Sequence, residues 1–116
     1  MTFKPPFLDL TQARELAADD DMLRELVQTF ADSLNIELTK ARAAFQDQDE
    51  ERVHFSLHAL KGFLPLFCQP KLAQAMIILY QDCRQQALPQ TQAAYQALEP
   101  AFLALQEEVR AWLGAL

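Results

Sequence analysis

The sequence predicts an all-α protein, an antiparallel four-helix bundle with a short additional N-terminal helix. Only 2 of the 116 residues are glycine, alanine, leucine and glutamine are common, and β-branched residues are few, which favours helix. Four long segments carry apolar residues every three or four positions, and short polar or proline-containing breaks separate them. Because short connections make successive helices antiparallel, these segments form one bundle domain spanning residues 1–116.

The short first helix is expected near residues 9–17, where it would cover one end of the bundle. Asp9-Leu10-Thr11-Gln12 is typical of a capping box, with Asp9 as the N-cap and Gln12 at the third helical position. The acidic residues 19–21 then place negative charge where the dipole of the next helix favours it. That helix is expected to end at the polar run 46–49. Its apolar stripe consists of Leu23, Leu26, Val27, Phe30, Leu34, Leu38, Ala41 and Phe45.

Prolines punctuate the remaining segments. Pro70 suits the first position of the fourth helix. Leu88-Pro89-Gln90 forms the next break, with Thr91 as a candidate N-cap, and Pro100 either kinks the last helix or marks its true start. The apolar stripes of the last three long segments are Val53, Leu57, Leu60, Leu64 and Phe67; Leu72, Met76, Leu79 and Cys83; and Leu98, Phe102, Leu105, Val109, Trp112 and Leu116.

Charge and composition narrow the class of protein. A net charge of −6 argues against binding to nucleic acid or to an anionic membrane surface, because both need clustered lysine and arginine. No apolar run approaches the roughly 18 residues of a membrane span, and the N-terminus does not resemble a signal peptide. A cytoplasmic monomer is therefore expected. Cys68 and Cys83 are expected to be reduced core thiols, and a reactive Cys68 is the less favoured alternative.

The most informative motif is His58-Ala59-Leu60-Lys61-Gly62, in the third helical segment. Glycine in a helix interior costs about 1 kcal/mol relative to alanine, which suggests that another molecule approaches the helix there. His58 lies off the apolar stripe, with His54 and Gly62 one turn to either side on the same face. A neutral imidazole is a nucleophile, and a nearby lysine can neutralise the charge that a phosphoryl group brings. The motif therefore predicts a phosphoryl acceptor.

With this motif on the second bundle helix, the chain resembles the histidine-containing phosphotransfer (HPt) family of multistep two-component signalling. The resemblance covers roughly residues 8–87. Upstream, the family's leucine-rich helix ending in phenylalanine is matched by Leu23, Leu26 and Phe30. Downstream, the apolar positions of its third bundle helix are matched by Lys71-Leu72, Met76 and Leu79.

The resemblance implies a role for each site residue. His58 would be the phosphoacceptor through its Nε2, Lys61 would balance the charge, and Gly62 would give access. Tyr80 stands twenty-two positions after the histidine, where the family has a polar residue that orients the imidazole, and Arg84 would meet the phosphate. The docking face around the histidine would include His54, Phe55, Pro65 and Leu66.

The implied protein is a phosphoryl carrier and not an autonomous kinase. Its partners would be receiver domains of response regulators or hybrid histidine kinases. It would have no intrinsic cofactor and no metal site of its own, because the receiver would supply Mg²⁺. The alternative is an HPt-like interaction module that binds a receiver or kinase without being phosphorylated, which the unusual residues Phe63, Pro65 and Tyr80 favour.

Two further alternatives concern single residues. His54 and His58, at positions i and i+4, would suit a metal ion together with Glu50 or Glu51, although no further ligand is evident from another helix. Phe55 and Leu66 are expected to contact an adjacent helix, and the alternative is that they form an apolar rim for a docking partner.

Overall fold

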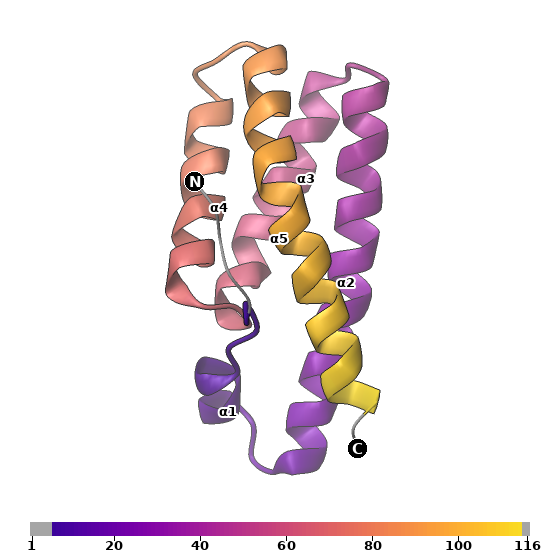
Figure 1. The fold of residues 1–116 in the computed structure, drawn as a ribbon, viewed down its shortest axis with the longest axis vertical. Coiled ribbons are helices and arrows are strands. Elements are labelled where there is room, and N and C mark those ends of the chain that lie inside the picture. Colours follow the sequence, from indigo (N-terminus) through magenta and orange to yellow (C-terminus); the bar gives the residue numbers. More distant parts are fainter. Residues whose placement is uncertain (1–5, 115–116) are drawn as a thin grey trace.

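The computed structural model describes residues 6–114, and this part of the chain is all-α, as predicted (Figure 1). Five α-helices and one 3₁₀ turn follow one another along the sequence. They are α1 (Thr11–Leu16), α2 (Asp20–Gln46), α3 (Glu50–Phe63), η1 (Leu64–Leu66), α4 (Pro70–Cys83) and α5 (Leu88–Gly114).

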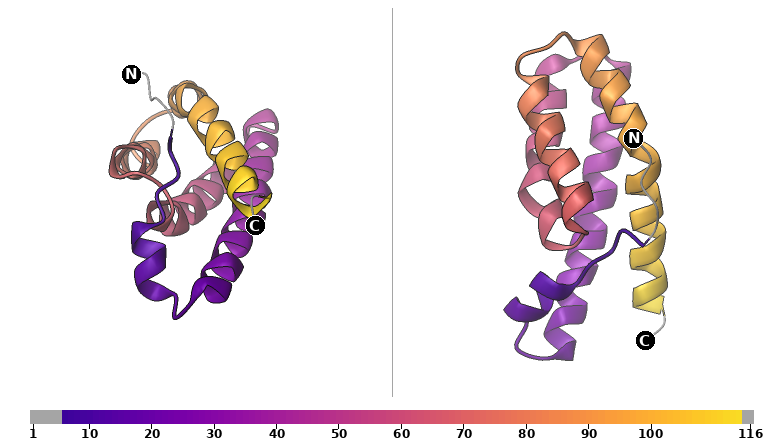
Figure 2. Two further views of the ribbon diagram at one scale, coloured as in Figure 1. Left: turned by 60° about the horizontal axis from the view of Figure 1, so that its bottom comes forward. Right: turned by 60° about the vertical axis from the view of Figure 1, so that its left-hand side comes forward.

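The helices surround a single apolar core. Helix α2 packs against α3 and α5, and α4 packs against the same two helices, while α1 lies beside the start of α2 (Figures 1 and 2). Every residue of the predicted apolar stripes within residues 6–114 is buried or half-buried; Leu116 lies outside the described residues. The fully buried side chains include Leu34, Leu57, Leu60, Leu64, Leu72, Met76, Phe102 and Leu105.

Acidic side chains and a proline start three of the helices. The carboxylate of Asp19 accepts a hydrogen bond from the Met22 backbone N–H at 2.8 Å, so it caps α2. Asp49 caps α3 in the same way, by accepting from the Arg52 N–H at 3.2 Å. Pro70 is the first residue of α4, as predicted, because its missing N–H is not needed there.

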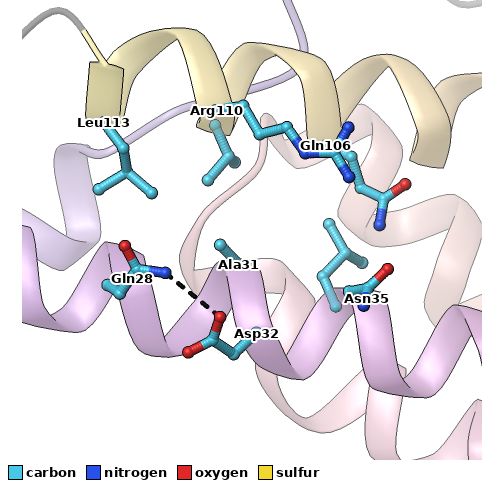
Figure 3. A pocket seen from close by; sticks show the side chains of 9 residues that line it. Gln28, Ala31, Asp32, Asn35, Gln106, Arg110 and Leu113 are labelled. Carbon is cyan, nitrogen blue, oxygen red and sulfur yellow. Dashed lines mark hydrogen bonds between the residues drawn. The ribbon is translucent and has the colours of Figure 1, made fainter.

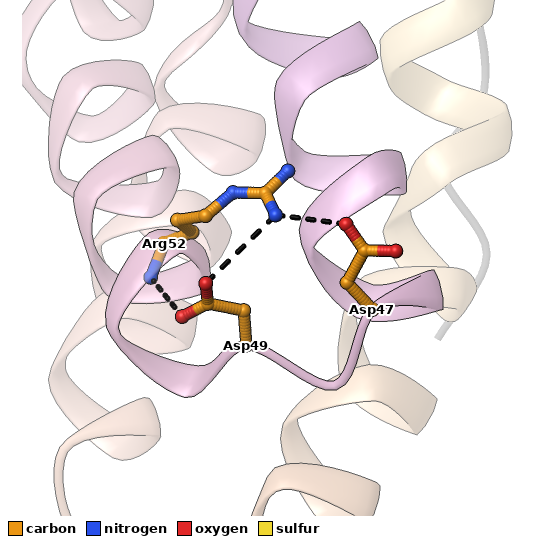
Figure 4. A network of polar contacts seen from close by, with 3 residues as sticks. All are labelled: Asp47, Asp49 and Arg52. Carbon is orange, nitrogen blue, oxygen red and sulfur yellow. Dashed lines mark hydrogen bonds and ion pairs between the residues drawn. The ribbon is translucent and has the colours of Figure 1, made fainter.

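The turn between α2 and α3 is held by charge and by one unusual backbone conformation. The guanidinium of Arg52 lies 2.8 Å from the carboxylate of Asp47 and 3.8 Å from that of Asp49 (Figure 4). Between these two aspartates, Gln48 has a φ of 54°, in the left-handed region that favours glycine. The turn is therefore well anchored but carries local backbone strain.

Replacing Gln48 by glycine is expected to stabilise the protein by about 0.5–1 kcal/mol, because glycine adopts this φ without a steric penalty. Urea unfolding followed by circular dichroism would measure the change. Gln46→Gly, in the last turn of α2, is the matched control and should destabilise, because there glycine only loses helix propensity. Equal effects of the two substitutions would show that the φ of Gln48 is not strained.

The capping box predicted at the first helix is wrong. Helix α1 begins at Thr11, and Leu10 takes the N-cap position without a side-chain hydrogen bond. The Asp9 carboxylate instead accepts a hydrogen bond from the Thr11 N–H at 3.0 Å. A bond from an aspartate side chain to the backbone two residues further on forms an Asx turn. This local bond, donated by the backbone, holds the pKa of the Asp9 carboxyl below its ordinary value.

The predicted N-cap at Thr91 is also wrong. Helix α5 begins at Leu88, so Pro89 lies in its first turn, where a proline costs no hydrogen bond, and Thr91 is buried inside the helix. The alternative that Pro100 marks the true start of the last helix is wrong, because α5 continues through it. Because Pro100 has no N–H, the carbonyl of Gln96 lacks its helical hydrogen-bond partner. Both residues are exposed, so water can bond to this carbonyl.

A proline also explains where α3 ends. Pro65 has no N–H to donate to the carbonyl of Lys61, and the chain tightens into the 3₁₀ turn η1 after Phe63. The apolar stripe nevertheless continues through this turn, since Leu64 and Phe67 are both buried.

The segment before α1, residues 7–9, forms what we call the N-terminal strap. The backbone N–H groups of Phe7 and Leu8 both donate to Oε1 of Glu108 on α5, at 2.7 and 2.8 Å. On its other side the strap pairs with the residues between η1 and α4, through Asp9 N–H to Phe67 O and Gln69 N–H to Phe7 O. The strap thereby joins α5 to the connection between η1 and α4.

Both cysteines are buried free thiols, as predicted. Burial raises the pKa of the Cys68 thiol to about 12, so it is protonated at neutral pH and the reactive alternative is not supported. Among the helices of residues 6–114, none combines the length and the apolar character that crossing a membrane requires.

Candidate functional site

Helix α3 places His58 on its exposed face. Leu57 and Leu60 on the same helix are buried against the core, and His58 points away from them to the surface. One turn earlier His54 is half-buried, and one turn later Gly62 is exposed. An amphipathic helix with this register presents the imidazole to solvent and keeps its backbone fixed by the core.

Tyr80 on α4 contacts the imidazole of His58 through both its hydroxyl and its ring. The Tyr80 hydroxyl lies 3.2 Å from Nδ1 of His58, and the two ring centroids are 5.3 Å apart. The guanidinium of Arg84, one turn further along α4, donates to the same hydroxyl at 3.3 Å. Because Nδ1 has this partner, Nε2 is the ring nitrogen left to face an incoming molecule.

Lys61 lies over the face of the same tyrosine. Its ammonium is 4.9 Å from the centroid of the Tyr80 ring, within the range of a cation–π interaction. Lys61 is half-buried, and it follows His58 by three residues, so the contact holds a positive charge on the side of the helix that bears the imidazole.

Nothing inside the protein requires a glycine at position 62. No glycine of the described residues has a positive φ, and a Cβ added to Gly62 would meet no atom within 4 Å beyond its immediate helical surroundings. An alanine would therefore fit and would favour the helix by about 1 kcal/mol. The effect of the glycine is to keep the surface bare one turn from His58.

A surface pocket of about 390 Å³ opens beside the imidazole. It is lined by Glu51, His54, Phe55, His58, Tyr80 and Arg84. Phe55 is 68% exposed, which favours the alternative of an apolar rim over packing against an adjacent helix. An exposed aromatic ring beside a nucleophilic nitrogen and an arginine gives this surface the features of a protein-binding site.

Two residues predicted for the docking face, Pro65 and Leu66, do not line this pocket. Pro65 and Leu66 are half-buried in η1, and Leu66 packs against the core as predicted for a helix contact. Leu66 also lines a separate groove with Leu26 of α2 and with Phe63, whose ring meets Phe30 edge-on at 5.7 Å. The structure therefore brings His54, Phe55, Tyr80 and Arg84 together around His58, and does not bring Leu66 into that pocket.

The metal alternative finds no support in the described residues. His54 is paired with Glu50 at 3.8 Å, and no group of three or more histidine, cysteine or acidic side chains within residues 6–114 is placed to hold a metal ion.

Another pocket, of about 330 Å³, lies between α2 and α5 (Figure 3). Gln28 donates to Asp32 at 3.2 Å along its α2 side, and Gln106 and Arg110 line its α5 side. It has no histidine or cysteine among its lining residues, so it offers no nitrogen or sulfur nucleophile comparable with His58.

The sequence does not predict the contact between Lys61 and the Tyr80 ring. The contact between Tyr80 and Arg84 could have been predicted, because the two residues are four positions apart on one helix. The contact of Lys61 with the Tyr80 ring depends on how α3 and α4 are rotated against each other, which no local pattern reveals.

Protein-family models, curated proteins and solved structures give no match to this chain.

Proposed function

We propose that this chain is an HPt-type histidine phosphotransfer protein, which accepts a phosphoryl group on His58 from a receiver-domain aspartate and passes it to a receiver on another protein. The observation that carries the proposal is the surroundings of His58. Its imidazole is exposed, Tyr80 engages Nδ1, and Gly62 leaves the neighbouring surface bare for no internal reason. A nucleophile that must be reached by another protein's active site needs these features.

The architecture proposed with this function is an antiparallel four-helix bundle of α2 to α5, with α1 as the additional helix, acting as one domain and as a cytoplasmic monomer. The packing of α2 against α3 and α5, and of α4 against the same pair, supports it. Short connections between these helices support their antiparallel order.

The chemical step is a balanced exchange of one bond for another. The lone pair of Nε2 attacks the phosphorus of the aspartyl phosphate, the N–P bond forms, and the P–O bond to the aspartate breaks, which releases a carboxylate. The neutral tautomer that leaves Nε2 free to attack carries its proton on Nδ1, so the phosphorylated ring is positively charged until that proton passes to solvent. In the onward transfer Nδ1 regains a proton from solvent, the carboxylate of the second receiver attacks phosphorus to form the new P–O bond, and the N–P bond breaks to release the neutral imidazole.

Charge neutralisation is the second contribution of the chain. The phosphoryl group brings nearly two negative charges, and Lys61 and Arg84 are cationic groups that both contact Tyr80, the hydrogen-bond partner of the imidazole. In this proposal Mg²⁺ comes with the receiver, and the carrier needs no intrinsic cofactor.

Substitution of Lys61 by alanine is expected to slow phosphoryl transfer about tenfold, equivalent to about 1.4 kcal/mol of transition-state stabilisation. The melting temperature should change little, because the Lys61 ammonium lies over the face of the Tyr80 ring and is not part of the apolar core. Rapid-quench measurement of labelled His58 would give the rate. Lys40→Ala, on α2, removes an exposed lysine whose partner is Glu37 and should leave the rate unchanged. An unchanged rate in Lys61→Ala would remove the lysine from the mechanism.

The proposed function is tested by incubating the protein with a ³²P-labelled phosphorylated receiver and Mg²⁺. Acid-labile, base-stable label on the wild type and none on His58→Gln is the expected result. Label that persists in His58→Gln would move the acceptor to another residue. No label from any cognate receiver would overturn the relay.

The competing function, an interaction module that is not phosphorylated, is favoured by the exposed ring of Phe55 beside the site. Receiver binding that is lost in Phe55→Ala, together with a complete absence of label, would support it.

A further inference from the structure

A smaller pocket lies between the last turns of α2 and the first half of α5. Its volume is about 240 Å³, and none of the residues that line the pocket beside His58 belongs to it. This volume suits a ligand smaller than the drug-sized molecules that occupy pockets of about 300–1,000 Å³. The polar side chains of the pocket belong to Arg42, Gln46, Gln92, Tyr95, Gln96 and Glu99.

Tyr95 brings a buried hydroxyl to this pocket. The residue is 2% exposed, and its ring lies 5.1 Å from that of Phe45 and 6.0 Å from that of Phe102, between centroids. Among the described residues, no group makes a hydrogen bond of ordinary geometry with the hydroxyl. Burial and then the Glu99 carboxylate raise the pKa of this hydroxyl, and Arg42 lowers it, so both charged groups lie close to the oxygen. Because buried polar atoms are nearly always hydrogen-bonded, this oxygen is available to a bound molecule.

An ion pair and a free backbone carbonyl accompany this hydroxyl. The Arg42 guanidinium on α2 lies 3.2 Å from the Glu99 carboxylate on α5, so the pair connects the two helices. Pro100 follows Glu99 and has no N–H, which leaves the carbonyl of Gln96, another lining residue, without its helical partner. A proline inside a helix is costly, and here it frees an acceptor within one turn of Glu99.

We propose that this pocket is a binding site for a free α-amino acid. The carboxylate of the ligand accepts hydrogen bonds from Arg42 and from the Tyr95 hydroxyl. Its ammonium donates to Glu99 and to the backbone carbonyl of Gln96. The site is formed by α2 and α5, whereas His58 lies on α3, so this inference does not rest on the proposed function.

An α-amino acid fits because the pocket brings charges of both signs together. The carboxylate and ammonium of such a ligand are attached to one carbon, so each can reach one member of the Arg42–Glu99 pair. The guanidinium has five N–H donors in a fork that matches a carboxylate, and an ammonium has three donors. A ligand with a single charge would pair with only one member of the ion pair. The two charges of an amino acid therefore match the two charged groups, the free hydroxyl and the free carbonyl at once.

The site is tested by NMR on the ¹⁵N-labelled wild-type chain. Each standard L-amino acid is added separately to about 10 mM, or to saturation where it is less soluble, which detects millimolar dissociation constants. For at least one of them, saturable shifts should appear at the backbone amides of Arg42, Gln46, Gln92, Tyr95 and Glu99. Propionate and ethylamine, with one charge each, should produce no saturable shift. No saturable shift with any amino acid would overturn the proposal, and so would equal shifts with propionate or ethylamine.

Two substitutions then locate the ligand. Tyr95→Phe keeps the ring and should weaken binding about three- to tenfold, the value of one hydrogen bond, without loss of stability in the free protein. Glu99→Gln should weaken it about tenfold or more, because it removes the charge that faces the ammonium. Glu107→Gln, which changes an exposed glutamate of α5 outside the pocket, is the control and should leave the dissociation constant unchanged. Wild-type affinity in both Tyr95→Phe and Glu99→Gln would overturn the site. The titration of the wild type decides the proposal even where a variant fails to fold.

Discussion

Replacing Gly62 by glutamine is expected to reduce the rate of phosphoryl transfer to His58 by about 100-fold or more while the protein stays folded. A glutamine at this position projects from the exposed face of α3, one turn beyond the imidazole. It would occupy the space that the receiver's aspartyl phosphate must enter. A displacement of the reacting groups by about 1 Å already costs about 10²-fold.

The folded state should tolerate this change well. A Cβ at position 62 meets nothing within 4 Å, and the backbone there is not in the left-handed region. Gly62→Ala should even stabilise the protein by about 0.5–1 kcal/mol, because glycine is the poorer helix former. A gain in stability accompanied by a loss of transfer is the signature of a residue kept for access.

The measurement is the rate of labelling from a phosphorylated receiver, beside thermal unfolding of each variant. The matched control is Gly114→Gln, since the other glycine of the chain also has open space around its missing Cβ but lies at the end of α5. The control should transfer at the wild-type rate. Wild-type transfer in Gly62→Gln would show that no partner approaches over this glycine.

The helices themselves could be predicted from apolar periodicity, because burying a stripe against a common core is the largest stabilising contribution and leaves a regular pattern. Leu34, Leu57, Met76 and Leu105, from four different helices, were all predicted as stripe residues and are all fully buried.

The helix ends were predicted less well, because several local signals compete there for the same backbone groups. Asp9 resembled an N-cap, but its backbone N–H donates to the carbonyl of Phe67, and α1 starts two residues later. Pro89 resembled a break between helices, but it lies in the first turn of α5. A proline just before a helix and a proline in its first turn cannot be told apart from the sequence alone.

Some residues of the site could be predicted from their spacing in the sequence, and others depend on how the helices pack. His58, Lys61 and Gly62 stand within five residues on one helix, so their spacing alone places them on neighbouring positions of the surface. Tyr80 was assigned a supporting role only through the family resemblance, and its contact with Lys61 depends on the packing of α3 against α4. The separation of Leu66 from the site follows from Pro65, which ends α3 before its face can continue.

Replacing Glu108 by alanine is expected to destabilise the protein by about 2–4 kcal/mol. Its carboxylate accepts from the backbone N–H groups of both Phe7 and Leu8, at 2.7 and 2.8 Å. Each hydrogen bond to a charged group contributes about 1.5–3 kcal/mol, and these bonds are half-buried, so water would recover part of that. They fix the N-terminal strap to α5.

The loss should extend beyond the two bonds. Phe7 is 2% exposed, and its carbonyl accepts from the Gln69 N–H directly before α4. A released strap would therefore expose an apolar ring and free the connection between η1 and α4. Hydrogen exchange should accelerate at Phe7, Leu8, Asp9 and Gln69 before it does in the centres of α2 and α5.

Glu107→Ala is the matched control. This neighbouring glutamate pairs only with exposed Arg110 in the described part of the chain, at 2.7 Å, so its loss should cost no more than about 0.5 kcal/mol. Urea unfolding of the two variants measures the difference. Equal stabilities would mean that the strap contributes nothing to the fold. A loss of stability in Glu108→Ala with unchanged exchange at Gln69 would mean that the strap does not support the connection between η1 and α4.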